Sequence, residues 1–298
     1  MKKALAACLA SLAGLAAAQG DLSKVEIKTT KLSDTVYLMV GSGGNLALSA
    51  GEDAAFLVDD QFAPLTPKIT AAVAAVTPKP VKFLLNTHWH FDHTGGNENF
   101  GKAGAVIVAH DNVRRRMNSE QLIEFLGMKT KPSPKAALPV VTFSADTTFH
   151  LNGEEIHAYH APRAHTDGDS IVLFRGSNVV HMGDIYFNGM YPFIDTSSGG
   201  TVAGVIAACD RVIAISDDKT KIIPGHGPLS NRQELKAYRD MLEAVSGRVR
   251  AMIAEGKKLE EIVAAGVSKD FDEKWGKGFI PAPKFAEMLT RNLLASGK

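Results

Sequence analysis

The stretch NTHWHFDHTGGN at residues 86–97 constrains this chain more than any other feature. It places His88, His90, Asp92 and His93 within six positions, directly after the apolar run VKFLLNT. In an extended segment residues i, i+2 and i+4 share a face, so His88, His90 and Asp92 can point the same way. His93 faces elsewhere unless the chain turns, which HTGG permits. So dense a cluster behind a buried strand favours a metal site over the alternative of polar loop histidines without ligand roles.

The side chains of this cluster limit which metal ions it can bind. Imidazoles and a carboxylate with no thiolate nearby suit zinc, with iron or manganese as alternatives. One metal cannot comfortably take all four groups, whereas two adjacent metals can divide them. More ligands must then come from elsewhere in the chain, and three candidates stand at the ends of strand-like runs: His165 in RAHTDGDS, Asp184 in HMGDIYF and His226 in IIPGHGP.

The pattern H-x-H-x-D-H, followed by these three segments in order, resembles the metallo-β-lactamase superfamily of binuclear hydrolases over about residues 25–230. The resemblance implies that His88, His90 and His165 hold one metal, that Asp92, His93 and His226 hold the second, and that Asp184 bridges the two with a hydroxide between them. It also implies that Asp59, at the end of FLVDD, supports the metal loop. Asp92 is the expected catalytic residue, which orients the nucleophile and passes its proton.

Short apolar runs along the chain predict the fold class. Four alternating runs between residues 24 and 60 indicate antiparallel strands, and further strand runs lie at 81–87, 104–110 and 140–183. Helices are expected at 64–76, 110–118 and 201–215, and from 231 onward. Each strand-rich half passes into helix, which predicts an α/β protein: two mixed sheets packed face to face with outer helices, an αββα sandwich. We expect one domain over residues 19–298 with a helical C-terminal segment. The Lys/Pro-rich segment 119–139 is expected to run over the surface.

The N-terminal residues predict export. Lys2 and Lys3, an apolar run from Ala4 and an A-x-A site ending at Ala18 indicate a signal peptide over residues 1–18, too short for a comfortable membrane span. A lipid-attachment reading of LAAC at 5–8 is disfavoured because only four apolar residues separate Lys3 from Cys8. The expected location is the periplasm or the outside of the cell.

Composition excludes some partners. Removal of Lys2 and Lys3 turns the formal net charge of +1 into −1, so no nucleic-acid footprint is expected. Neither is a membrane partner, and we expect a small-molecule substrate. Cys209 is the only cysteine left after removal of residues 1–18, so no internal disulfide can form. Its apolar setting indicates a small buried hydrophobe rather than a nucleophile.

Differences from the family patterns bear on the substrate. Zinc β-lactamases that carry a cysteine ligand have it where this chain has Asp184, and tend to keep a lysine where it has Phe187. The Asp184 pattern is similar to glyoxalase II, lactonases and other ester, thioester or phosphoester hydrolases. Ala164 and Asp169, however, depart from the GHTxGH motif common in those groups. The aromatic segment 185–200 could face the substrate or pack as a surface loop.

These observations predict an exported binuclear zinc hydrolase that acts on an amide, ester, lactone or thioester bond, with β-lactam hydrolysis as a main or side activity. A hydrolase like glyoxalase II or the lactonases is one alternative, and an iron-dependent oxidoreductase of the persulfide type is another. A non-catalytic zinc-binding protein is a third. The remaining histidines are expected to have no direct role, with His160 as the foremost exception because it lies close to His165 in the sequence.

Overall fold

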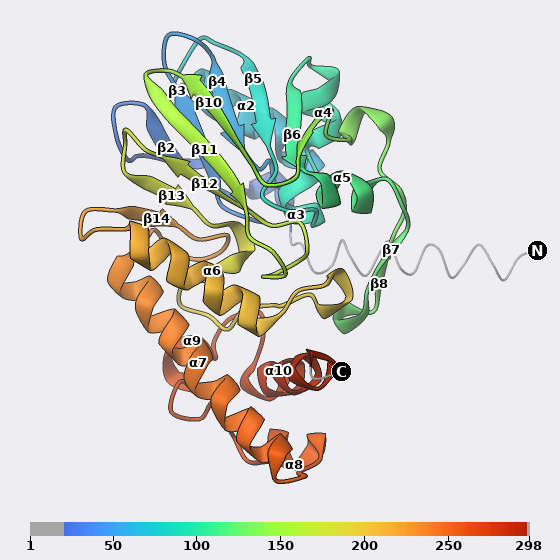
Figure 1. The fold of residues 1–298 in the computed structure, drawn as a ribbon. Coiled ribbons are helices and arrows are strands. Elements are labelled where there is room, and N and C mark those ends of the chain that lie inside the picture. The colour runs from blue at the N-terminus through green and yellow to red at the C-terminus, as the bar shows by residue number, and fades with distance from the viewer. Residues whose placement is uncertain (1–20, 297–298) are drawn as a thin grey trace, which may run out of the picture.

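A computed structural model describes residues 21–296, in which two β-sheets pack face to face between outer helices (Figure 1). The predicted αββα sandwich is thereby confirmed. The expected signal peptide at residues 1–18 lies outside the described residues. None of the helices within 21–296 is both long and apolar enough to cross a membrane.

The first sheet has seven strands, in the order β1-β2-β3-β4-β5-β6-β9. They are β1 (Lys28–Lys31), β2 (Val36–Val40), β3 (Leu46–Ala50), β4 (Ala55–Val58), β5 (Val81–Leu85), β6 (Val106–His110) and β9 (Val141–Phe143). The first four strands pair antiparallel, as predicted, and β4, β5, β6 and β9 pair parallel. Because β4 and β5 are parallel, Asp59 and the histidine cluster leave the sheet at the same edge.

The second sheet has six strands, in the order β10-β11-β12-β13-β14-β15. They are β10 (Asp146–Leu151), β11 (Glu154–His160), β12 (Ser170–Phe174), β13 (Val179–His181), β14 (Lys221–Ile223) and β15 (Ser230–Asn231). All neighbours are antiparallel except β13 and β14. That parallel pair brings the segments with Asp184 and His226 to one edge. The run VVTF at residues 140–143 opens the predicted strand region 140–183, but it forms β9 and closes the first sheet instead of joining the second.

The space between the sheets is filled by apolar side chains. Phe56, fully buried on β4, meets Phe149 of β10 edge-on with ring centroids 4.9 Å apart. Val36, Leu85, Val172 and further buried residues of both sheets join this cluster. Burial of each large apolar side chain contributes about 1.5–3 kcal/mol, so this interior layer holds the two sheets in one fixed alignment.

Helices cover the outer faces. On the first sheet lie α2 (Thr66–Ala74) and α4 (Asn97–Lys102), whose Ile69 and Phe100 pack on Leu57 and Ile107. On the second sheet lie α6 (Val202–Ile215) and α7 (Arg232–Ala254) (Figure 1). After the short α8 (Leu259–Ala264) and α9 (Asp272–Trp275), α10 (Ala282–Ser296) packs on the helices α6, α7 and α8. Cys209 of α6 is buried and free, in the small apolar role that we predicted.

The segment 119–139 contains structure of its own. After α5 (Asp111–Met117) the chain forms a hairpin of β7 (Gln121–Ile123) and β8 (Met128–Thr130), separate from both large sheets. Figure 1 shows this hairpin reaching from the first half of the chain toward α10. The turn of this hairpin contacts the aromatic segment 185–200: Phe125 lies against Phe193, with ring centroids 5.7 Å apart.

Candidate metal centre

The predicted ligands converge at one edge of the sandwich, where strands of both sheets end. His88 and His90 follow β5, and Asp92 and His93 lie on the one-turn helix α3 (Phe91–Thr94). His165 follows β11, Asp184 lies in a 3-10 turn after β13 (Gly183–Ile185), and His226 follows β14. Their ligand atoms form two groups, each within 4.8 Å: His88, His90, His165 and Asp184, and then Asp92, His93 and His226.

The turn into α3 corrects one expectation. An extended chain would place Asp92 beside His88 and His90, but the helical turn begins at Phe91 and directs Asp92 and His93 together toward His226. The histidine cluster thus serves both groups because the chain changes conformation in its middle.

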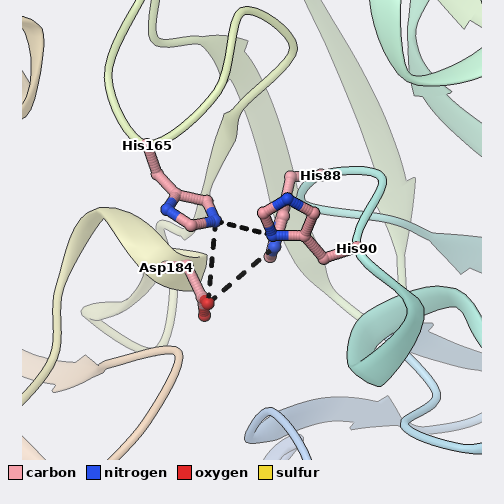
Figure 2. Close-up of side chains that lie close together, drawn as sticks. All are labelled: His88, His90, His165 and Asp184. Atoms are coloured by element: carbon pink, nitrogen blue, oxygen red, sulfur yellow. Dashed lines mark hydrogen bonds and ion pairs between the residues drawn. The ribbon is translucent and has the colours of Figure 1, made fainter. Parts of the chain in front are cut away.

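The first group is closed to solvent. His88, His90 and His165 are 1%, 4% and 0% exposed, and Asp184 is 5% exposed. Figure 2 shows the rings of His88, His90 and His165 pointing toward one another and toward the Asp184 carboxylate. The Nε2 atom of His165 lies 2.9 Å from Nδ1 of His90 and 3.8 Å from Oδ2 of Asp184. The same Asp184 oxygen lies 3.9 Å from Nε2 of His88.

Hydrogen bonds on the far side of each ring fix where its proton lies. His165 donates from Nδ1 to the Phe193 carbonyl at 2.8 Å, and His90 donates from Nε2 to Oδ2 of Asp195 at 3.0 Å, since both partners can only accept. A neutral imidazole carries one N–H, so the facing nitrogens of His165 and His90 both present lone pairs. Two lone pairs 2.9 Å apart in a buried site repel unless a cation lies between them.

His88 completes this arrangement. The Thr87 hydroxyl donates to Asp59 Oδ2 at 2.7 Å, so it accepts from Nδ1 of His88 at 3.0 Å. That leaves Nε2 of His88 as a buried acceptor with no hydrogen-bond partner in the described chain. Burial also lowers the pKa of His88 well below its ordinary value and that of His165 to about 4, which keeps both rings neutral. Neutral imidazoles are the form that binds metals, so the residues of this group fit a metal ion.

The second group is more open. Asp92 and His226 have side chains 20% and 24% exposed, whereas His93 is fully buried. Nε2 of His226 lies 3.2 Å from Oδ2 of Asp92, and Nε2 of His93 lies 3.6 Å from the same oxygen. His93 donates from Nδ1 to Asp59 Oδ2 at 2.8 Å, so its Nε2 faces the group with a lone pair when the ring is neutral.

Asp184 stands between the groups. Oδ1 lies 3.0 Å from Nε2 of His93, and Oδ2 lies 3.3 Å from Nε2 of His226. Burial alone would raise the pKa of Asp184, but the imidazoles of His226 and His93 hold it well below its usual range. Burial alone would lower the pKa of His226, yet Asp184 and Asp92 raise the pKa of that ring to about 10. The carboxylates thus concentrate negative charge that protons or a bound cation neutralise.

Asp59 holds the loop from beneath. Besides His93 and the Thr87 hydroxyl, it accepts the Thr87 backbone N–H at 2.7 Å. Asp59 is fully buried and has φ of 60°, a left-handed conformation that costs about 1 kcal/mol or more outside glycine and persists where the surroundings enforce it. Gly225 has to be glycine, because a Cβ there would collide with Asp184 Oδ1 and keep the His226 loop from approaching.

Sequence reasoning missed Asp195 and the Phe193 carbonyl. Asp195 is almost fully buried, accepts the Ser198 hydroxyl at 2.5 Å as well as His90, and lies in a loop that α10 clamps. Asn292 of α10 donates to Thr196 Oγ1 at 2.8 Å and to the Gly200 carbonyl at 2.9 Å. The only local signal was the run DTSS, which is typical of a helix cap, and Asp195 does cap the turn Thr196–Ser198.

Other predicted neighbours divide into two kinds. Phe187 stacks on His226 with centroids 5.2 Å apart and Phe193 stacks on His90 at 5.9 Å, so these two rings of the 185–200 segment wall the centre. Tyr186 and Tyr191 are fully buried core residues instead. Asp169 does not reach the groups; it accepts the Thr166 N–H at 2.8 Å and closes the His165 turn, and burial raises its pKa to about 8.

His160 lies away from the ligands. Its ring stacks on His110 with centroids 3.7 Å apart, and its Nε2 donates to the Asp167 carbonyl at 3.0 Å. A cavity of about 340 Å³ lies beside α3, and Phe62, Phe91, Met128 and Lys129 are among the residues that line it.

Comparison with known proteins agrees with this geometry. The family model described as the metallo-beta-lactamase superfamily matches residues 35–230. A hydroxyacylglutathione hydrolase from Polaromonas sp. is 27% identical over 178 residues, which cover 59% of this chain and 60% of that protein. An acyl-coenzyme A thioesterase, MBLAC2 of Bos taurus, is 24% identical over 154 residues, 47% of this chain and 54% of that protein. The matched region therefore spans little more than half of these relatives.

Solved structures share the fold. A metallo-beta-lactamase from Pontibacter korlensis superposes with a TM-score of 0.61 at 19% identity, and covers 73% of this chain and 99% of its own. The metallo-beta-lactamase FIM-1 from Pseudomonas aeruginosa, in its mono-zinc form, gives 0.58 at 19% identity, with 74% and 96% covered.

Proposed function

The chain belongs to the metallo-β-lactamase superfamily, and from this premise we propose that it is an exported hydrolase that holds two zinc ions and cleaves an acyl bond in a small molecule. His88, His90 and His165 hold one ion in this proposal, Asp92, His93 and His226 hold the other, and Asp184 contacts both. The observation that carries it is the convergence of buried imidazole lone pairs on one point, with each proton fixed by Asp195, the Phe193 carbonyl or Thr87.

Two zinc ions held by these residues would supply Lewis acidity to polarise the scissile carbonyl and to activate water for attack at neutral pH. The protein residues supply orientation and proton transfer. Asp92 is the ionised group at the open mouth, since His93 and His226 lower its pKa against the effect of burial. Its carboxylate is therefore placed to accept the proton of the nucleophile and to release it toward the leaving group. Asp195 fixes the orientation of the His90 ring, and Asp59 fixes that of the His93 ring.

A thioester or ester is the substrate bond that we favour. The two relatives named as a hydroxyacylglutathione hydrolase and an acyl-coenzyme A thioesterase support it, and so does Asp184 in place of a cysteine. The cavity beside Phe91 offers apolar side chains for an acyl group, and Lys129 among its lining residues offers a cation for an anionic group. β-Lactam hydrolysis enters as a side activity, supported by the fold of the solved relatives alone.

Export rests on the pattern of residues 1–18. If cleavage follows Ala18, mass spectrometry of the protein recovered from the periplasm should show Gln19 as its first residue. An intact N-terminus would contradict the signal peptide without bearing on the metal centre.

The test of the function is metal content by elemental analysis combined with turnover of a panel: an acyl thioester, a lactone, a cephalosporin and a phosphodiester. We expect two zinc ions per chain and turnover of the thioester that a chelator abolishes and added zinc restores. Replacement of the exposed His150 by alanine is the control and should change neither quantity. Bound iron with oxygen uptake on a persulfide would instead favour an oxidoreductase. A metal-loaded protein inactive on every substrate would favour a binding protein.

A further inference from the structure

The last helix of the chain, α10, packs against the loop that supports the first ligand group. The helix begins beyond residue 230, where the match to the family ends. Phe285, Met288 and Asn292 follow one another at intervals of three and four residues, which places them on one face of this helix. All three are buried. Their partners lie in residues 191–202, which lead into α6 and which we call the support segment (Figure 1).

The first two residues of this face hold the start of the support segment. The ring of Phe285 stacks on that of Tyr191, with centroids 4.1 Å apart. The sulfur of Met288 accepts the backbone N–H of Ile194 at 3.2 Å. Since Tyr191 and Ile194 lie on either side of Phe193 in the chain, the helix fixes the backbone around the Phe193 carbonyl.

Asn292 holds the remainder of the support segment with a single side chain. Its Nδ2 donates to Thr196 Oγ1 at 2.8 Å and to the Gly200 carbonyl at 2.9 Å. Its Oδ1 accepts the backbone N–H of Val202 at 3.0 Å. The Asn292 side chain is buried, so water does not readily take its place. Alanine at this position would deprive these polar groups of a buried partner and release the end of the segment.

The support segment orients two of the three rings in the first group. The Phe193 carbonyl accepts from Nδ1 of His165, and the Asp195 carboxylate accepts from Nε2 of His90. The backbone N–H of Asp195 also donates to the His165 carbonyl at 3.0 Å. A contact that holds this segment in place therefore also holds both imidazoles in the orientation that presents their lone pairs to an ion.

The second group has no comparable link to the support segment. Within residues 21–296 this segment forms no hydrogen bond or ion pair with Asp92, His93 or His226. His93 is oriented instead by Asp59, which follows β4 of the first sheet. A displacement of the support segment should therefore act on the first group and leave the second in place.

We propose that Asn292 is a positioning residue of the metal centre, which acts through the support segment on His90 and His165. This inference rests on the proposed two-zinc site and adds the C-terminal helix to it. Because coupling between two sites is reciprocal, an ion on the first group should in turn hold α10 on the support segment. The second ion should depend on Asn292 far less.

Competition for zinc with an indicator tests the effect of the helix on the metal. The Asp92→Ala background isolates the first group, since it removes a ligand of the second. Asn292→Ala in this background should weaken the remaining ion about fivefold to tenfold, less than the loss of a direct ring partner would. In the otherwise unmodified protein, Asn292→Ala should leave unchanged the weaker of the two stepwise affinities, which we assign to the second group. Arg291→Gln, on the exposed face of α10, is the matched control and should leave both affinities unchanged.

Hydrogen exchange tests the effect of the metal on the helix and needs no substitution. In the unmodified protein the amides of α10 should exchange at least about threefold more slowly with zinc bound than after chelation. The amides of α2, on the outer face of the first sheet, are the internal reference and should change less. This measurement decides the question if circular dichroism shows that Asn292→Ala does not fold.

The outcomes distinguish a failure of this inference from a failure of the proposed function. If the unmodified protein binds two zinc ions and Asn292→Ala binds them equally well, the inference is wrong and the proposed function stands. Equal weakening of both ions would also overturn it, because Asn292 would then serve stability alone. So would an exchange rate of α10 that zinc does not change. If the unmodified protein binds no zinc, the inference falls together with the proposed function.

Discussion

The two halves of the metal centre contrast in how tightly the protein holds them. In the first half, His88, His90 and His165 are nearly inaccessible, and each ring has a protein partner on its far side. In the second half, Asp92 and His226 are about one-fifth exposed, and only His93 has such a partner. The protein's own hydrogen bonds thus hold the first half in place, whereas the second half has fewer protein partners and more contact with solvent.

This difference indicates that the two halves have different roles, one in metal retention and the other in access for the substrate. Rigid ligands with satisfied outer partners raise the affinity for a metal, and an open coordination side is what a substrate needs. Asp184 is shared, because its oxygens approach His93 and His226 and face the first group as well. The first half should retain its ion under conditions in which the second releases it.

The largest expected effect comes from removing one ligand on each side. His90→Ala and Asp92→Ala should each lower turnover at least about 10³-fold, since a metal contributes several kcal/mol to the transition state. Both variants should remain folded, because the inter-sheet core lies outside the cluster. Turnover and the circular dichroism spectrum measure this. Near-normal activity in either variant would refute the assignment of that half.

Chelation should separate the two halves next. As the concentration of a chelator rises, the metal content should fall from two equivalents to one before it falls to zero, and Asp92→Ala should retain one equivalent. Elemental analysis after dialysis at each concentration gives the metal-to-chain ratio. Simultaneous loss of both ions would contradict the contrast. A His90→Ala variant in which the open half still retained its ion would contradict it too.

A smaller effect should follow from Asp195, whose carboxylate accepts from His90 and whose backbone N–H donates to the His165 carbonyl at 3.0 Å. Asp195→Asn removes the charge that holds the His90 ring and should weaken the metal of the first half about 10- to 100-fold. The second half should be unaffected. Competition with a zinc indicator measures the two affinities, and Asp218→Asn, at an exposed aspartate that follows α6, is the matched control. An equal loss in both halves would mean that the loop acts on the whole centre.

Much of this architecture could be predicted because it is encoded locally. The alternation of runs such as VYLMV and LALSA gives strands directly, and His88, His90 and His93 cluster in sequence. What could not be predicted depends on long-range contacts: β9 joins the first sheet through pairing with β6, and Asp195 reaches His90 across 105 residues. A short loop such as DTSS carries no trace of a partner so distant.

The cluster itself shows the same limit on a smaller scale. The spacing of His88, His90 and Asp92 suggested one shared face, and the turn at Phe91 overrules it. That turn is fixed by packing: a Cβ at Gly95 would lie 2.7 Å from the Gln61 carbonyl, so the loop after β4 presses against α3. The metal groups were inferred from family likeness, whereas the hydrogen bonds that fix their protons became visible only in three dimensions.

The smallest expected effect concerns histidines outside the centre, which serve as a reference for it. Burial lowers the pKa of both His110 and His160, although neither has a carboxylate partner like those of the second half. The unfolded chain, whose histidines titrate near pH 6.5, therefore binds protons more readily than the folded chain below that pH. The free energy of unfolding should then fall as the pH drops below about 6.5.

In His160→Gln this loss of stability should be smaller, as thermal melts at pH 8 and pH 5 would show. His150→Gln, on an exposed strand position, is the control and should keep the slope of the unmodified protein. A slope unchanged in His160→Gln would mean that the acid sensitivity arises elsewhere, with the carboxylate-rich half as the next candidate.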